Sequence, residues 1–197
     1  MKILATEYLK SVTSPDNLSG EPFPEICFVG RSNVGKSSMI NKLVMQKVAR
    51  TSSTPGATRT INLYKVSYEF RGSRKSILFS DFAGFGYAKV SKAVYTGWQK
   101  MIEAYVSQNS RIEKLIWVYD VRRDIDELDR TLIDWLHSLR LDFTMVLTKI
   151  DKESRSKVMS KKGLFSRYFG DSRVFTFSAK DGYGRKELLS HIFDAGE

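Results

Sequence analysis

Hydrophobic positions along the chain follow two alternating patterns. Continuous apolar runs of the kind found in buried parallel strands occur at 26–29, 115–121, 143–147 and 174–177. The segments that we predict to be helical lie at 36–44, 98–106, 126–139, 153–169 and 186–193. Residues 61–70 and 76–82, joined by a turn at 71–74, predict an antiparallel hairpin. This alternation predicts an α/β fold whose largely parallel sheet is covered by helices on both faces.

The chain length indicates a single domain. The 197 residues fall within the usual domain size of ~100–200, and 42% hydrophobic with 27% charged residues argues against general disorder. Residues 1–24 are mixed and interrupted by Pro15, Gly20, Pro22 and Pro24. We expect them to form a lead-in that packs on or extends the domain, and residues 25–197 to form the domain itself.

Charge and cysteine content narrow the class of protein. With 32 Lys and Arg against 22 Asp and Glu, the net charge is +10, which favours a polyanionic partner over a merely solvated basic surface. Cys27 is the only cysteine and cannot form an internal disulfide, and two histidines do not make a zinc cluster. A reducing, cytoplasmic location fits. No apolar run approaches ~18 residues, so we expect no membrane insertion.

A phosphate-binding motif follows the first buried run. The pattern G-x-x-x-x-G-K-[ST] is met by Gly30, Arg31, Ser32, Asn33, Val34, Gly35, Lys36 and Ser37, with Ser38 next in the helix. The glycines let successive backbone N–H groups face a phosphate, and the helix N-terminus adds its positive dipole end. Lys36 is expected to reach the β- and γ-phosphates and the Ser37 hydroxyl to ligate Mg²⁺.

Two further segments predict which base is bound. Thr148, Lys149, Ile150 and Asp151 follow the run at 143–147. The Asp151 carboxylate can accept hydrogen bonds from guanine N1–H and N2–H₂, a donor pair that adenine lacks. The aliphatic stem of Lys149 can cover the base. Phe177, Ser178 and Ala179 follow the last strand and are expected to bring backbone N–H groups to the guanine O6.

Two loops have the composition of nucleotide-sensing switches. Asp81, Phe82, Ala83 and Gly84 end the hairpin; Asp81 can hold Mg²⁺ through water, and the Gly84 N–H can sense a γ-phosphate. Gly56, Ala57, Thr58, Arg59 and Thr60 lie between the first helix and the hairpin. The Thr58 hydroxyl is expected to complete a Mg²⁺ shell with Ser37 and Asp81. These elements occur in the order that a small GTPase requires.

The chain resembles the EngB (YihA/YsxC) GTP-binding proteins, a branch of the Era/TrmE-like GTPases, over almost its whole length. The similarity extends beyond the nucleotide motifs to Val12-Thr13-Ser14, Asp16-Asn17-Leu18, Phe23-Pro24-Glu25-Ile26, Arg50-Thr51-Ser52, Thr54-Pro55-Gly56 and Gly84-Phe85-Gly86-Tyr87-Ala88. Two positions depart from the family pattern. Ala83 replaces a proline, which loosens a fixed φ, and Asp120-Val121-Arg122-Arg123 replaces D-A-R-H.

The resemblance implies a Ras-like domain with a six- or seven-stranded sheet and one antiparallel strand. It further implies hydrolysis of GTP to GDP and phosphate as a switch in assembly of the large ribosomal subunit, with ribosomal RNA as partner. We do not expect DNA to be a partner, and we expect the protein to be a monomer. The association of the family with cell division and septation is interpreted as an indirect effect of ribosome supply.

Hydrolysis has no catalytic residue that the sequence identifies. Ras-like enzymes often place a water-orienting Gln after D-x-x-G, whereas Phe85 follows Gly84 here, so a slow intrinsic rate is expected. In related GTPases an Asn at the position of Asn33 resembles a K⁺ ligand. Such an ion would neutralise charge that develops in the transition state. Asn33 either binds K⁺ in this way or only hydrogen-bonds within its loop.

Part of the basic excess lies between 152 and 162, where one acid, Glu153, accompanies five cations, Lys152, Arg155, Lys157, Lys161 and Lys162. This stretch is either a solvated helix face or a phosphate-contacting surface. Two rival functions stay open on the residues alone. One is a P-loop kinase, although no arginine-rich lid is present. The other is a basic RNA-binding module that keeps a nucleotide only structurally.

Overall fold

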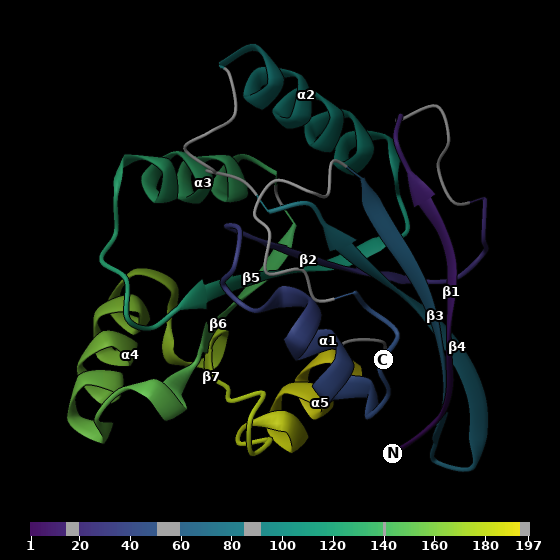
Figure 1. Ribbon diagram of the computed structural model, residues 1–197. Helices are drawn as coiled ribbons and strands as arrows, with labels where there is room; N and C mark the ends of the chain where they lie inside the picture. Colours follow the sequence, from purple (N-terminus) through teal and green to yellow (C-terminus); the bar gives the residue numbers. More distant parts are fainter. Residues whose placement is uncertain (15–19, 51–59, 85–91, 140, 194–197) are drawn as a thin grey trace.

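Seven strands form one sheet in the order β1-β3-β4-β2-β5-β6-β7 (Figure 1). The computed structural model describes residues 1–14, 20–50, 60–84, 92–139 and 141–193. The strands are β1 (Lys2–Val12), β2 (Glu25–Gly30), β3 (Ile61–Phe70), β4 (Ser73–Phe82), β5 (Ile112–Asp120), β6 (Asp142–Thr148) and β7 (Val174–Thr176). β3 runs antiparallel to both β1 and β4, and the other pairings are parallel. The predicted α/β fold with one antiparallel strand is confirmed.

Within the described residues, five helices connect the strands. They are α1 (Lys36–Val44), α2 (Lys92–Gln108), α3 (Glu127–Ser138), α4 (Arg155–Phe169) and α5 (Arg185–Phe193). Two short 3₁₀ turns, η2 (Ile150–Lys152) and η3 (Asp171–Arg173), flank α4. Each predicted helix is present, and α2 begins six residues before the predicted start at 98. None of the helices in the described ranges is long and apolar enough to cross a bilayer.

The hairpin turn is shorter than predicted. The predicted turn at 71–74 contracts to two residues, Arg71 and Gly72, and β4 begins at Ser73. Both turn residues have positive φ, 49° and 78°. A two-residue turn of this kind matches the twist of the flanking strands, so the ladder extends to the turn itself.

Alternate residues of the central strands point to opposite faces of the sheet. On β2, Ile26 and Phe28 pack with α1 and α5, whereas Cys27 and Val29 pack with α2, α3 and α4. All four side chains are buried. The sheet is therefore covered on both faces (Figure 1), and both faces of its central strands must be apolar. This is why the strands appear in the sequence as continuous runs rather than as alternating patterns.

The lead-in segment supplies an edge strand. β1 pairs with β3 from Lys2 to Val12, with irregular register after Ile3 and after Tyr8. Its pattern of partly exposed residues and its charged Lys2, Glu7 and Lys10 suit an edge that faces solvent. β1 lies on the side of the sheet away from β7, so it leaves the opposite flank of the molecule to α4 (Figure 1).

Candidate functional site

The predicted site residues gather where the carboxyl ends of the parallel strands meet. Register pairs Gly30 of β2 with Val118 of β5, and Asp120 of β5 with Thr148 of β6. Phe28 of β2 pairs with Asp81 of β4 on the other side. Because parallel strands end on one edge, the loops that follow β2, β4, β5 and β6 meet there. Four separate sequence segments thus converge.

The loop from Gly30 to Ser37 has a curled backbone. φ is +156° at Gly30, +63° at Asn33 and +102° at Gly35, which is the N-terminal cap of α1. A Cβ on Gly30 would lie 2.4 Å from the Val118 carbonyl oxygen, so only glycine fits against β5. This curl turns the N-terminus of α1 toward the loop, the arrangement that binds a phosphate anion.

Lys36 crosses the loop instead of extending into solvent. It is 7% exposed, and its Nζ donates to the carbonyl oxygens of Gly30, at 3.0 Å, and Arg31, at 3.1 Å. Burial lowers the pKa of the Lys36 ammonium, and the nearby Asp81 carboxylate raises it. The ammonium is therefore held in place at the centre of the loop, where a phosphate oxygen would gain most from it.

Ser37 and Asp81 form a pair of oxygen donors next to Lys36. The Ser37 Oγ donates to Asp81 Oδ2 at 2.6 Å. Burial raises the pKa of the Asp81 carboxyl, while Lys36 and the Ser37 hydroxyl lower it. A hydroxyl and a carboxylate are the hard oxygens that Mg²⁺ prefers, and both come from elements that also hold the phosphate loop. The pair fits the predicted metal position.

The segment after β4 lies directly against the phosphate loop. Ser32 Oγ donates to the Gly84 carbonyl oxygen at 3.1 Å. A Cβ on Gly84 would lie 2.6 Å from Ser32 Cα, so this close approach requires glycine. Phe82 and Ala83, just before it, are buried. The prediction that Gly84 adjoins the phosphates is consistent with this contact, although Ala83 takes the place of the family's proline.

The base-recognition segment is bound to the phosphate loop by two side chains. Thr148 Oγ1 donates to the Val34 carbonyl oxygen at 2.6 Å. Lys149, at φ +57°, donates through Nζ to the Asn33 carbonyl oxygen and pairs with Asp120 Oδ2 at 3.0 Å. Lys149 therefore runs across the edge of the loop, and its methylene stem is available to cover a planar base. Ile150 begins the η2 turn that follows.

Asp151 and the segment after β7 lie in direct contact. Ser178 Oγ donates to Asp151 Oδ1 at 3.1 Å. The N–H of Phe177 donates to Leu147 O, and that of Ser178 to Tyr183 O. Both of these amides are occupied within the protein, which leaves the Ala179 amide as the candidate among the three predicted residues to meet a guanine O6. The bond from Ser178 orients Asp151, whose second oxygen lies 3.8 Å from Lys152 Nζ.

Two acidic positions of the site were not assigned a role from the sequence. Asp120 accepts a two-pronged contact from Arg122, at 2.9 and 2.7 Å, in addition to Lys149. Asp126 caps α3 and binds Arg31 of the phosphate loop. An Asp at a strand end and an Asp-x-x-Asp pair before a helix are signals that a sequence offers, but neither specifies its cationic partner.

Part of the predicted site lies outside the described residues. This applies to Gly56, Ala57, Thr58 and Arg59, and to Phe85, the position of the missing Gln. Thr60 is described: it is partly buried, and its Oγ1 is 3.3 Å from Asn62 Oδ1. No group of three or more His, Cys, Asp or Glu side chains suited to a metal occurs within the described ranges. The magnesium assignment therefore depends on Ser37 and Asp81.

Comparison with known proteins gives consistent matches. A family model described as "50S ribosome-binding GTPase" matches residues 25–149. The probable GTP-binding protein EngB of Aquifex aeolicus is 40% identical over 173 residues, covering 87% of this chain and 91% of that protein. The corresponding protein of Syntrophus aciditrophicus is 39% identical over 194 residues, covering 98% and 95%. A crystal structure of a probable GTP-binding protein engB superimposes with a TM-score of 0.66 at 26% identity, over 87% of this chain and 97% of that one.

Proposed function

Because the chain belongs to the EngB family of GTP-binding proteins, we propose that it binds GTP with Mg²⁺ and hydrolyses it to GDP and phosphate. In this proposal it is a cytoplasmic, monomeric switch for assembly of the large ribosomal subunit. The observation that carries the proposal is the convergence of Lys36, Lys149 and Asp151 on one edge, with Lys149 bound to the phosphate loop and Asp151 oriented by Ser178.

In this proposal, different residues bind the phosphates, the metal ion and the base of the nucleotide. The N–H groups of the curled loop and the Lys36 ammonium bind the β- and γ-phosphates. Ser37 and Asp81 would hold Mg²⁺, which neutralises charge on the phosphate oxygens when bound. Asp151 accepts the guanine N–H donors, and Ser178 fixes its orientation. Exchange of adenine for guanine would leave the Asp151 carboxylate without its donors, and this gives base selectivity.

Hydrolysis transfers the γ-phosphoryl group to water. The bond between the γ-phosphorus and the β–γ bridging oxygen breaks, and a new bond to the water oxygen forms, so that GDP and phosphate leave. The chain positions the phosphates and supports the developing charge through Lys36. We assign no general base to this step. A potassium ion held by Asn33 is a proposed addition, because it would stabilise the same developing charge.

The ribosomal role is supported by the family description and by charge. Relatives in this family model are described as binding the 50S ribosome, and the chain carries a net charge of +10. A basic protein that grips RNA phosphates displaces counterions, so its affinity falls steeply as salt rises. Ribosomal RNA is therefore the proposed partner and DNA is not. An effect on cell division and septation would follow indirectly from ribosome supply.

Sedimentation with purified ribosomal subunits tests the proposal. The protein is loaded with a non-hydrolysable GTP analogue, with GDP or with no nucleotide, and pelleted with each subunit at several salt concentrations. We expect the analogue form to pellet with the large subunit and to be released by salt. Equal pelleting in all three states would favour the basic module with a structural nucleotide. Transfer of the γ-phosphoryl group to a small acceptor instead of water would favour the kinase.

A further inference from the structure

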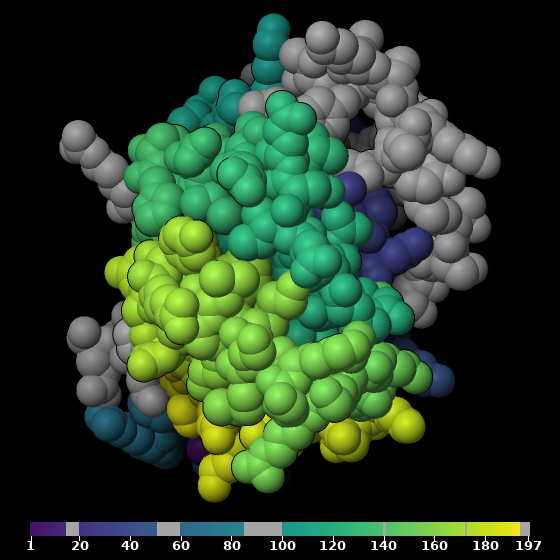
Figure 2. Space-filling model, turned by 90° about the vertical axis from the view of Figure 1, so that its left-hand side faces the viewer, coloured from purple at the N-terminus to yellow at the C-terminus, as the bar shows by residue number. Residues whose placement is uncertain are grey.

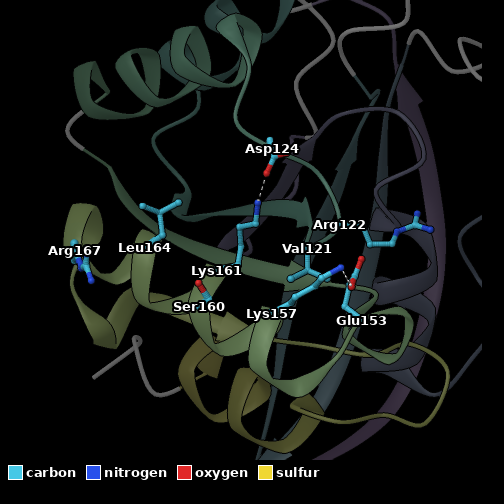
Figure 3. Close-up of a pocket in the computed structure, with 9 residues that line it drawn as sticks. All are labelled: Val121, Arg122, Asp124, Glu153, Lys157, Ser160, Lys161, Leu164 and Arg167. Carbon is cyan, nitrogen blue, oxygen red and sulfur yellow. Dashed lines mark hydrogen bonds and ion pairs between the residues drawn. The ribbon is translucent and has the colours of Figure 1, made fainter.

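A hollow of about 520 Å³ lies between α4 and the segment that follows β5, and no residue from 30 to 37 lines it (Figure 3). We propose that this hollow, here called the α4 groove, binds a single-stranded segment of RNA through its phosphates. The inference rests on the proposed function, since it names the surface by which the ribosomal partner is held. Arg122 and Arg167 stand at its two ends in Figure 3, and Lys157 and Lys161 lie between them.

α4 carries more cations than any other helix of the described residues, and no acidic residue accompanies them. It has five cations and no acidic residue: Arg155, Lys157, Lys161, Lys162 and Arg167. Only Val158, Phe165 and Phe169 are buried, and they form the narrow stripe that packs on the sheet. Such a composition is not needed for packing. α4 is the lower of the two helices on the face of the molecule shown in Figure 2, with α3 above it.

Helical spacing gathers several of these side chains on the groove side. Lys157, Lys161 and Leu164 line the groove, and Tyr168 continues their row beyond that lining, at intervals of four, three and four residues. Leu164 is 39% exposed and Tyr168 is 68% exposed. Two cations followed in one row by an exposed aromatic ring suit single-stranded nucleic acid, because phosphates can meet the cations and a base can stack on the ring.

Lys161 holds the groove together. Its Nζ donates to the Arg123 carbonyl oxygen at 2.6 Å and to Asp124 Oδ1 at 2.8 Å (Figure 3), and its side chain is only 17% exposed. Lys161 therefore joins α4 to the segment after β5 and gives the groove a fixed width. Lys157 differs, because it is 74% exposed and has one exchangeable partner, Glu153, at 3.2 Å. Lys157 can turn to a phosphate at little cost.

The two carboxylates of the groove favour RNA among polyanions. Asp124 and Glu153 would repel a phosphate, but each can accept a hydrogen bond from a ribose 2′-hydroxyl, which DNA lacks. A single strand can enter a concave groove, whereas the flat surface of an anionic bilayer cannot reach its floor. In a duplex the bases are paired and stacked on one another, so a duplex would offer no base to stack on Tyr168. The chemistry therefore indicates single-stranded RNA.

Fluorescence anisotropy of the full-length protein, loaded with a GTP analogue, tests the proposal. The probes are a labelled oligouridylate of about 12 nucleotides and the matching oligodeoxyuridylate. The variant Lys157→Ala/Arg167→Ala removes two groove charges. The control Arg155→Ala/Lys162→Ala removes two charges from the opposite side of the same helix. Analogue binding by each variant verifies the fold. Tyr168→Ala tests stacking without a change in charge.

We expect the groove variant to bind the RNA about tenfold more weakly and to lower the slope of log affinity against log salt by about 1.4, for two lost phosphate contacts on a single strand. The control should stay within about twofold, and Tyr168→Ala should weaken binding at unchanged salt slope. Equal losses in both double variants, or none in either, would overturn the proposal, as would equal affinity for the DNA probe.

Pelleting of the same variants separates this inference from the proposed function. If wild type and the groove variant pellet equally well with large subunits, the proposal that the α4 groove binds RNA is overturned. The proposed switch function would then stay in place. If wild type pellets with no subunit, the ribosomal role is overturned. Selective loss of RNA binding in the groove variant would still support the proposal that the α4 groove binds RNA.

Discussion

Lysines serve opposite purposes at the phosphate loop and on α4. Lys36 is 7% exposed and is fixed by two carbonyl oxygens, whereas Lys157 has a side chain that is 74% exposed and one carboxylate partner. Burial raises the electrostatic value of a charge but demands fixed geometry. An exposed charge interacts more weakly because solvent screens it, but its side chain can reorient to meet different partners. A site for one ligand of constant shape suits the first arrangement, and a surface for a variable polymer suits the second.

Replacing Lys36 should produce the largest effect of the variants considered. It should weaken nucleotide binding at the phosphate loop and leave the α4 groove unchanged. Lys36→Ala is expected to weaken both GDP and GTP by about 3–6 kcal/mol, because two charged contacts at about 1.5–3 kcal/mol each are lost. Titration with a fluorescent GDP or GTP measures this. Lys75→Ala, an exposed lysine near the hairpin turn, is the matched control.

Ser37→Ala tells binding apart from metal use at the same loop. It should leave nucleotide affinity without metal close to wild type and abolish the gain from Mg²⁺, because the hydroxyl bonded to Asp81 is removed. Wild-type GTP affinity in both Lys36→Ala and Ser37→Ala at millimolar Mg²⁺ would refute the assignment of this loop.

Asp151→Asn should change the base preference. The variant is expected to lose about 2–4 kcal/mol of GTP affinity and to favour XTP, since xanthine has a carbonyl where guanine has an amine. Competition between GTP and XTP for a labelled nucleotide gives the ratio. Unchanged guanine affinity would mean that the base lies elsewhere, and the contact from Ser178 to Asp151 would then be purely structural.

The same contrast explains what the sequence could predict. A phosphate loop needs glycines, a lysine and a hydroxyl at fixed spacing, so its position was predictable to the residue, as was α1 from Lys36 to Val44. The pairing of Lys149 with Asp120 and of Arg31 with Asp126 was not, because nothing in a linear spacing specifies which carboxylate a distant cation meets. The groove beside α4 needed the same three-dimensional information, since the contact that joins its two sides, from Lys161 to Arg123, spans 38 residues of sequence.

Asn33 tests whether the phosphate loop recruits a potassium ion. We expect wild-type GTP hydrolysis to be about tenfold faster in KCl than in NaCl at matched ionic strength. This difference should vanish when Asn33 is replaced. Asn33 has φ +63°, so Asn33→Ala adds backbone strain to loss of the amide. Asn33→Gly loses the amide without that strain and is the sharper variant. A rate indifferent to the cation, or stimulation that persists in Asn33→Gly, would exclude this role.

Asp120 connects the two regions, because Lys149 on one side reaches the phosphate loop and Arg122 on the other lines the α4 groove. Burial raises the pKa of the Asp120 carboxyl, but hydrogen bonds from Arg122 and Lys149 outweigh it and lower the pKa to about 2. In an unfolded chain the carboxyl titrates near 3.9. Its ion pairs therefore stabilise the fold fully above about pH 4, and this stabilisation is lost as the pH falls through about 2.

Thermal unfolding of Asp120→Asn against wild type isolates this smallest of the expected effects. The contribution is about 1 kcal/mol, because Arg122 is half exposed and solvent screens its charge. The melting temperatures should differ by about 2–4 °C more at pH 6 than at pH 2. Asp134→Asn, an exposed position on α3, controls for a general change in charge. If the gap between Asp120→Asn and wild type is the same at both pH values, Asp120 is held by neutral contacts, and no electrostatic link joins the phosphate loop to the α4 groove.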